Sequence, residues 1–193
     1  MHYLALIIIP KEIQTRGDNA VYQYIHEIMK QFDEQREVKS YIMIPRDQFQ
    51  AKYEEYKADH PNCGYATARQ FMEDYHVGPF DYDGNLLSTR NPQGIYDWYS
   101  IGGRWGGELT GTRGDNLKND MIPVKKLHDT LTTDNCTYGC VIDRQGRLQR
   151  DKNMHWRISL ETVNITPEEW RQQYEKILTE SADDYVVNLD CHC

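Results

Sequence analysis

Hydrophobic positions along the chain switch between extended and helical spacing, and their order predicts the fold class. Tyr3–Ile9 is a short apolar run bounded by proline, which is typical of a buried, central strand. From an expected N-cap at Asp18, apolar residues recur at helical spacing as far as Phe32. A second strand, with weak alternation, is expected over Val38–Ile44. The chain therefore opens with a strand, a helix and a strand.

The next section is more polar and helical. Phe49, Tyr53 and Tyr56 lie at i, i+4 and i+7, which places aromatic rings on one helix face. A second short helix is expected over Thr67–Tyr75. Together these helices predict an insertion-like section over residues 45–77.

From Gly78 onward the pattern is mainly extended. The expected strands are Leu86–Arg90, Asp97–Ile101, Trp105–Thr110, Met121–Leu127, Tyr138–Ile142 and Arg147–Arg150. Asp143–Gly146 is a turn signal that joins the last two as a hairpin. Thr166, Pro167 and Glu169 predict a helix start, and a final strand is expected over Tyr185–Leu189. This order predicts a single α+β domain over residues 1–193, with a mostly antiparallel sheet and helices packed on it.

Composition narrows the classes of partner. The formal net charge of −8 disfavours long nucleic acids, because phosphate contacts dominate that affinity, although one arginine pocket can still bind a small anion. No segment is apolar enough to cross a bilayer, and five cysteines are most simply reduced thiols in a cytoplasm. Fourteen tyrosines suit ligand pockets or the boundaries of a homo-oligomer, or simply cover the edges of a core.

The main candidate for chemistry is the segment from Asn91 to Gly107, where glycines surround an arginine and aromatic residues. Exposed backbone N–H groups beside Arg104 would form an anion pocket, and the aromatic faces would stack a nucleobase. The expected ligand is a small nucleotide, with no further cofactor. The structural alternative is that the glycines form bulges, that Trp105 is core and that Arg104 pairs with Asp97. The remaining candidate ligand-binding residues of this segment are Trp98, Tyr99, Gly102 and Gly103.

Two histidines lie beside the first and last expected strands. If those strands are neighbours, the imidazoles of His2 and His192 lie together and can serve as base and acid for phosphodiester cleavage. Asp190, two residues before His192, shares its face on a strand and could orient a ring. Arg104 would stabilise the charged transition state. The alternative is that both histidines are exposed chain ends.

Four cysteines offer a weaker possibility. Cys136 and Cys140, with Cys191 and Cys193 on either side of His192, could combine into a zinc site. Neither half has the usual Cys-x2-Cys spacing, so buried thiols are the simpler interpretation and no metal is expected.

Several of these motifs together resemble an uncharacterised family of bacteriophage and bacterial proteins. The shared parts are His2-Tyr3-Leu4, Asn91-Pro92, Asp97-Trp98-Tyr99-x-Ile101-Gly102-Gly103-Arg104-Trp105 and the closing Asp190-Cys191-His192. The chain departs from the family where a Gly-Trp-Phe-Gly-like segment is expected, since it has Met154-His155-Trp156-Arg157. The resemblance implies a shared site at His2, Arg104 and His192, and a phage setting implies action against host defence in the host cytoplasm.

Three functions follow as hypotheses. The first is a metal-independent phosphodiesterase that degrades a small cyclic or linear nucleotide signal. The second is a protein that binds and sequesters such a signal without chemistry. The third is a protein–protein inhibitor of a host defence enzyme, whose acidic surface would imitate nucleic acid.

Overall fold

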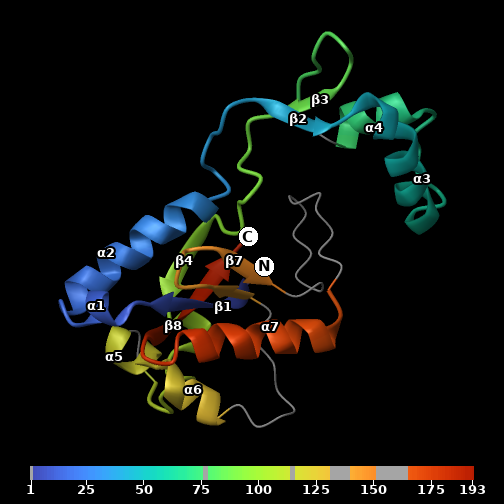
Figure 1. Ribbon diagram of the computed structural model, residues 1–193. Helices are drawn as coiled ribbons and strands as arrows, with labels where there is room; N and C mark the ends of the chain where they lie inside the picture. The colour runs from blue at the N-terminus through green and yellow to red at the C-terminus, as the bar shows by residue number, and fades with distance from the viewer. Residues whose placement is uncertain (1, 76–77, 114–115, 131–139, 151–164) are drawn as a thin grey trace. The chain divides into compact units, whose positions relative to one another are not determined.

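The chain divides into two compact units, as described by a computed structural model (Figure 1). The structure describes residues 2–75, 78–113, 116–130, 140–150 and 165–193. The larger unit combines Met1–Arg36 with Asn91–Cys193, and the smaller unit is Glu37–Arg90. The smaller unit contains the helical section expected over residues 45–77 and extends it on both sides.

The larger unit is built on a mostly antiparallel sheet. Within the described residues its strand order is β4-β8-β1-β6-β7, and β5 pairs with another part of β8. The β1–β6 pair is parallel and the other pairs are antiparallel. The strands are β1 His2–Ile9, β4 Trp98–Ile101, β5 Met121–Pro123, β6 Cys140–Ile142, β7 Leu148–Arg150 and β8 Tyr185–His192. The predicted α+β class with a mostly antiparallel sheet is confirmed.

Helices cover both faces of this sheet because β1 is apolar on both sides. Ile7 and Ile9 pack with α2, whereas Leu6 and Ile8 pack with α6 and α7 (Figure 1). α7 begins with the predicted capping box, in which Thr166 and Glu169 bond to each other's backbone N–H. The helical elements are α1 Lys11–Gln14, α2 Asp18–Met29, η1 Lys30–Phe32, η3 Gly103–Trp105, α5 Leu117–Asp120, α6 Val124–Thr130 and α7 Pro167–Glu180.

The first and last strands are direct neighbours, which is the condition for the terminal histidines to lie together. β1 and β8 pair antiparallel along their whole length, from His2 opposite His192 to Ile9 opposite Tyr185. Figure 1 shows both ends of the chain at the same end of this sheet. β4 pairs with the other side of β8, so that Trp98 lies opposite His192. The pairing brings residues from the two ends and the middle of the sequence into one row across three strands.

The smaller unit has its own apolar core. Its two strands pair antiparallel, and two helices pack against them. The elements are β2 Tyr41–Ile44, η2 Arg46–Gln48, α3 Phe49–Asp59, α4 Ala68–Tyr75 and β3 Leu86–Ser88. The buried core residues are Ile44, Phe49, Tyr53, Phe71, Met72 and Leu86. The aromatic face predicted for α3 therefore forms part of this core.

Three predicted elements are corrected. The strand expected over Trp105–Thr110 is instead a 3-10 turn followed by further turns, because Gly102, Gly103 and Gly107 have positive φ angles that an extended strand cannot hold. The strand expected over Met121–Leu127 ends after Pro123 and continues as α6. Asp18 is the first residue of α2, and the N-cap is Gly17, without a side-chain cap.

Candidate active site at the paired chain ends

His2 and His192 lie in contact on one face of the sheet. Their ring centroids are 4.9 Å apart, with an edge-to-face angle of 72° between the planes. The arrangement follows from the register, because directly opposed residues of an antiparallel pair point to the same face. The condition under which His2 and His192 would meet is therefore fulfilled, and the two imidazoles are neighbours.

Each imidazole is held by its own carboxylate. His2 Nδ1 lies 2.8 Å from Asp190 Oδ1, and His192 Nδ1 lies 2.8 Å from Asp97 Oδ1. Since a carboxylate only accepts hydrogen bonds, each Nδ1 carries a proton, and Nε2 is the ring nitrogen through which each imidazole would exchange one. Orientation of an imidazole by a carboxylate is the arrangement that general acid–base catalysis uses.

The two pairs differ in burial. The side chains of His2 and Asp190 are 17% and 3% exposed, whereas those of His192 and Asp97 are 31% and 27% exposed. Burial acts to raise the pKa of Asp97, but the hydrogen bond and charge of His192, with backbone N–H groups, together lower that pKa below its usual value. Asp97 therefore favours its charged form beside His192, as an orienting carboxylate requires.

Trp98 completes an aromatic cluster beside the histidines. Its ring stacks on His192 with centroids 5.3 Å apart and an angle of 12°, and it meets His2 edge to face at 5.2 Å. Trp98 is still 45% exposed, so part of the indole faces solvent. An exposed indole fixed by stacking can offer a flat surface to a planar group.

Arg104 lies on η3, the turn that follows β4. Its backbone N–H donates to Asp190 Oδ2 at 3.0 Å, and its side chain is exposed. The alternative pairing of Arg104 with Asp97 is not formed, since Asp97 pairs with His192. Within the described residues, no carboxylate forms an ion pair with the Arg104 guanidinium.

The glycine-rich turn uses its backbone N–H groups differently from the predicted anion pocket. Two of them bind buried carboxylates of the protein itself: the Arg104 N–H binds Asp190, and the Gly107 N–H binds Asp120 at 2.7 Å. The Gly102 N–H donates to the Asn188 carbonyl, and the Asn188 amide donates to the Trp105 carbonyl at 2.7 Å. The turn is therefore fastened to β8, and any anion would meet the Arg104 side chain instead.

Other predicted site residues lie on the opposite face of the sheet. Tyr99 packs with the α2 side of the core and meets Tyr96 edge to face at 5.1 Å. Cys140 and Cys191 are buried on that same side, and burial raises the pKa of the Cys191 thiol to about 12. Because neighbouring strand residues alternate in direction, Cys191 points away from the face that carries His192. Within the described residues, no group of three or more potential metal ligands converges.

Asn91, part of the motif that carries the resemblance, has a structural role. Its buried side-chain amide donates to the carbonyls of Gln31 and Asp33, at 2.6 and 2.9 Å. These bonds fasten the segment before β4 to the end of η1. The polarity of Asn91 gave no indication of this from the sequence, since both partners are more than fifty residues away in the chain.

No protein-family model, curated protein or solved structure matches this chain. Cys136 and the segment Met154–Arg157 lie outside the described residues. In the part of the chain that is described, no helix has both the length and the apolar character needed to span a bilayer.

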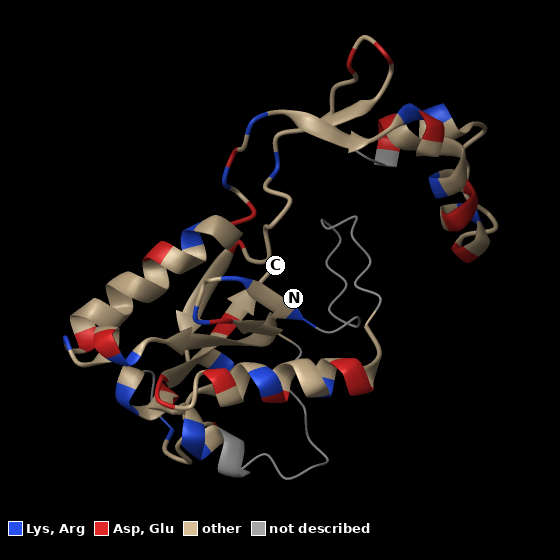
Figure 2. Ribbon diagram, in the orientation of Figure 1, with Lys and Arg blue, Asp and Glu red and all other residues tan. Residues whose placement is uncertain are grey.

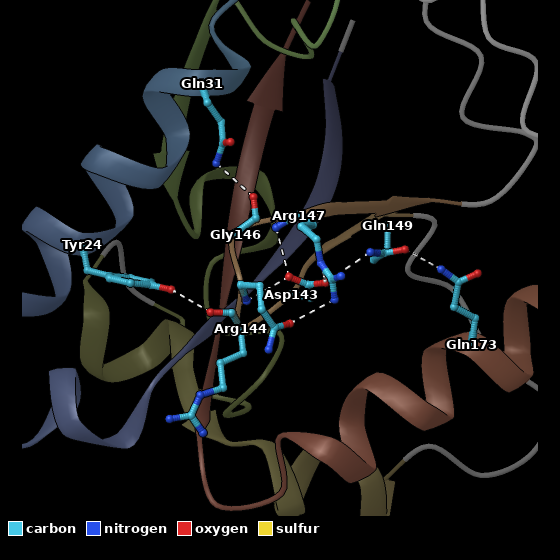
Figure 3. A network of polar contacts seen from close by, with 9 residues as sticks. Tyr24, Gln31, Asp143, Arg144, Gly146, Arg147, Gln149 and Gln173 are labelled. Carbon is cyan, nitrogen blue, oxygen red and sulfur yellow. Dashed lines mark hydrogen bonds and ion pairs between the residues drawn. The ribbon is translucent and has the colours of Figure 1, made fainter.

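A concave region lies beside the β6–β7 hairpin, away from the histidines. A cavity of about 450 Å³ is lined by residues of η1, the 92–95 loop, the hairpin and α7. Its polar side chains largely bond to the protein: Gln31 donates to the Gly146 carbonyl, and Gln173 is hydrogen-bonded to Gln149 (Figure 3). Asp143 accepts from Arg147 and Gln149 in the same network. These contacts hold the hairpin between η1 and α7, which gives the cavity walls a structural role.

Proposed function

We propose that this protein is an acid–base phosphodiesterase that cleaves a small cyclic or linear nucleotide. His2 and His192 exchange protons with the substrate, and Arg104 binds the phosphate. The observation that carries the proposal is the pair of imidazoles in contact, each with Nδ1 bound to a carboxylate. Two oriented imidazoles supply both proton transfers that phosphodiester cleavage needs.

The reaction consumes one water molecule. One Nε2 takes a proton from water while the water oxygen bonds to phosphorus, and the bond from phosphorus to the leaving oxygen breaks. The second imidazole, protonated at the start, gives its Nε2 proton to that leaving oxygen. A phosphodiester and water become a phosphomonoester and an alcohol, and the next turnover begins once the proton is passed between the rings or exchanged with solvent.

Two exposed groups support a nucleotide as substrate. Arg104 has its backbone N–H on Asp190, the carboxylate that also binds His2, and its exposed guanidinium is available to bind phosphate oxygens in a bidentate manner. Trp98, 45% exposed, can stack a nucleobase, an interaction of about 1–3 kcal/mol in other proteins. That the nucleotide is an immune signal of a phage host rests on the family resemblance and on analogy.

The test is turnover of a panel of cyclic dinucleotides, cyclic trinucleotides and linear dinucleotides, followed by chromatography and mass spectrometry, with and without a chelator. We expect His2→Ala and His192→Ala each to lower turnover by about 100-fold or more while ligand still binds, since general acid–base catalysis typically contributes 10²–10⁴-fold. Arg104→Ala should weaken binding as well. His26→Ala and Arg16→Ala change exposed residues of the same types and serve as matched controls.

A sequestering protein is the alternative, because Arg104 and Trp98 would bind a nucleotide without any need for proton transfer. Calorimetry that shows tight binding of a nucleotide, with the ligand recovered intact, would favour this alternative. His192→Ala should then leave function largely unchanged, and Arg104→Ala should not. Turnover that survives both histidine substitutions would refute the acid–base proposal.

An inhibitor of a host defence enzyme is the third hypothesis. Along α7 the acidic residues are interspersed with basic ones and paired with them, as in Glu168 with Arg171 and Glu180 with Lys176 (Figure 2). Interspersed charge does not imitate the uniform line of phosphates in a nucleic acid. A single stoichiometric partner captured from host lysate would favour inhibition over both nucleotide hypotheses.

A further inference from the structure

The Asp190 carboxylate is held from two sides in the core of the larger unit. Its Oδ1 lies 2.8 Å from His2 Nδ1, and its Oδ2 accepts the Arg104 backbone N–H at 3.0 Å. The side chain is only 3% exposed, so water contributes little to holding it. The orientation of the His2 ring therefore depends on where the turn places the backbone of Arg104.

The approach of that turn requires glycine. A Cβ atom at Gly103 would lie 2.4 Å from Asp190 Cβ, 2.5 Å from Asp190 Oδ2 and 2.6 Å from Ser100 Oγ. Gly103 also has a φ of 54°, in the left-handed region that favours glycine. A side chain here would have to displace either the carboxylate or the turn.

We infer that the turn of Gly102 and Gly103 is a positioning element for His2 that acts through Asp190. That the turn orients His2 rests on the geometry alone. That this orientation matters for catalysis rests on the proposed function. The backbone N–H of Arg104 in this turn fixes Asp190 Oδ2. Asp190 Oδ1 then accepts the Nδ1–H of His2 and so fixes its tautomer. His2 Nε2 is the atom that exchanges a proton with the substrate. Gly103 and Asp190 thus act through His2 and need not touch substrate.

Asparagine at position 190 gives a sharp test, because its side chain has one acceptor oxygen where the carboxylate has two. The two donors of the native site, the Arg104 N–H and the His2 Nδ1–H, compete for that oxygen. If the amide oxygen keeps the Arg104 N–H, the amide nitrogen faces His2 and donates to Nδ1. His2 must then change to the Nε2–H tautomer. His192, which is held by Asp97, should keep its own tautomer.

The experiment uses the full chain labelled with ¹⁵N-histidine, and long-range ¹H–¹⁵N spectra report the tautomer of each imidazole. His2→Gln and His192→Gln assign the two signals. We expect the Nδ1–H pattern at both rings of the wild type, a change at His2 alone in Asp190→Asn, and a shifted His2 signal in Gly103→Ala. Gly111→Ala is the matched control, because Gly111 also has a positive φ of 73° but its added Cβ meets nothing within 4 Å.

The outcomes separate this inference from the proposed function. An unchanged His2 signal in both Asp190→Asn and Gly103→Ala, with each variant folded, overturns the positioning role. Equal changes in Gly111→Ala and Gly103→Ala overturn it too, since backbone strain would then be the cause. If a nucleotide is turned over, Asp190→Asn should lower kcat by up to about 10⁴-fold with little change in KM, the size of loss seen when a catalytic histidine loses its orienting carboxylate. Tautomer changes without any turnover would uphold the positioning role and refute only the enzyme proposal.

Discussion

Asp143→Ala should destabilise the larger unit substantially, because this one carboxylate organises the turn of the β6–β7 hairpin. Its side chain is 5% exposed and accepts four hydrogen bonds (Figure 3). Oδ1 binds the backbone N–H groups of Gln145 and Arg147, and Oδ2 binds the side chains of Arg147 and Gln149. β6 in turn pairs with β1, the strand that carries His2.

The magnitude follows from what each donor loses. The two backbone N–H groups lose a charged acceptor in a part-buried turn, at about 1–1.5 kcal/mol each, and the Gln149 amide loses about 0.5–1 kcal/mol. The Arg147 side chain is 67% exposed, so it recovers hydrogen bonds from water and contributes little. The expected loss is about 3 kcal/mol. Asp143→Asn keeps one acceptor oxygen and should lose roughly half as much.

Urea unfolding followed by tryptophan fluorescence measures this loss in the larger unit alone, because all four tryptophans lie outside residues 37–90. The matched control is Asp183→Ala, which removes an exposed carboxylate and should change the stability by less than about 0.5 kcal/mol. If Asp143→Ala and Asp183→Ala unfold at the same urea concentration, the hairpin network does not carry the stability assigned to it.

Two further predictions concern titration and burial. Because the folded-state pKa of Asp97 is lowered, its contribution to stability is present above its unfolded pKa of 3.8 and is lost as the pH falls through the folded value. The melting temperature of the wild type should therefore exceed that of Asp97→Asn at neutral pH, and the difference should shrink below about pH 4; a constant difference would contradict this. The buried Cys191 thiol, with a pKa of about 12, should resist iodoacetamide at pH 8 in the folded protein, whereas half-buried Cys63 reacts. Peptide mapping after labelling, with a denatured sample as control, checks this, and equal labelling of both cysteines in the folded protein would show that the core opens on the labelling timescale.

The local sequence pattern correctly predicted those elements in which every residue favours the same secondary structure. The apolar run of β1 and the capping signature of α7 both appear where the sequence predicts them. β8 extends past its predicted end at Leu189 to His192. The polar residues Asn188 and Asp190 lie within it and are buried, because β8 lies between β1 and β4.

One part of the candidate site could be predicted from the sequence and another part could not. The contact between His2 and His192 could be predicted once the first and last strands were taken as neighbours. The two histidines stand beside those strands at ends that an antiparallel pair brings together. The partners of the glycine-rich turn were not predictable. Gly102 approaches Asp120 and Gly103 approaches Asp190, eighteen and eighty-seven residues further along the chain, and only the folded sheet brings them together.

By itself, the sequence determined the fold class, the strand that forms the centre of the sheet and the set of residues able to transfer protons. The tertiary structure decided which of those residues face one another and which backbone N–H groups remain available to a ligand. The physical reason is that periodicity and capping depend on neighbours within one or two turns of chain. Strand register and hydrogen-bond partners depend instead on groups brought together from distant parts of the sequence.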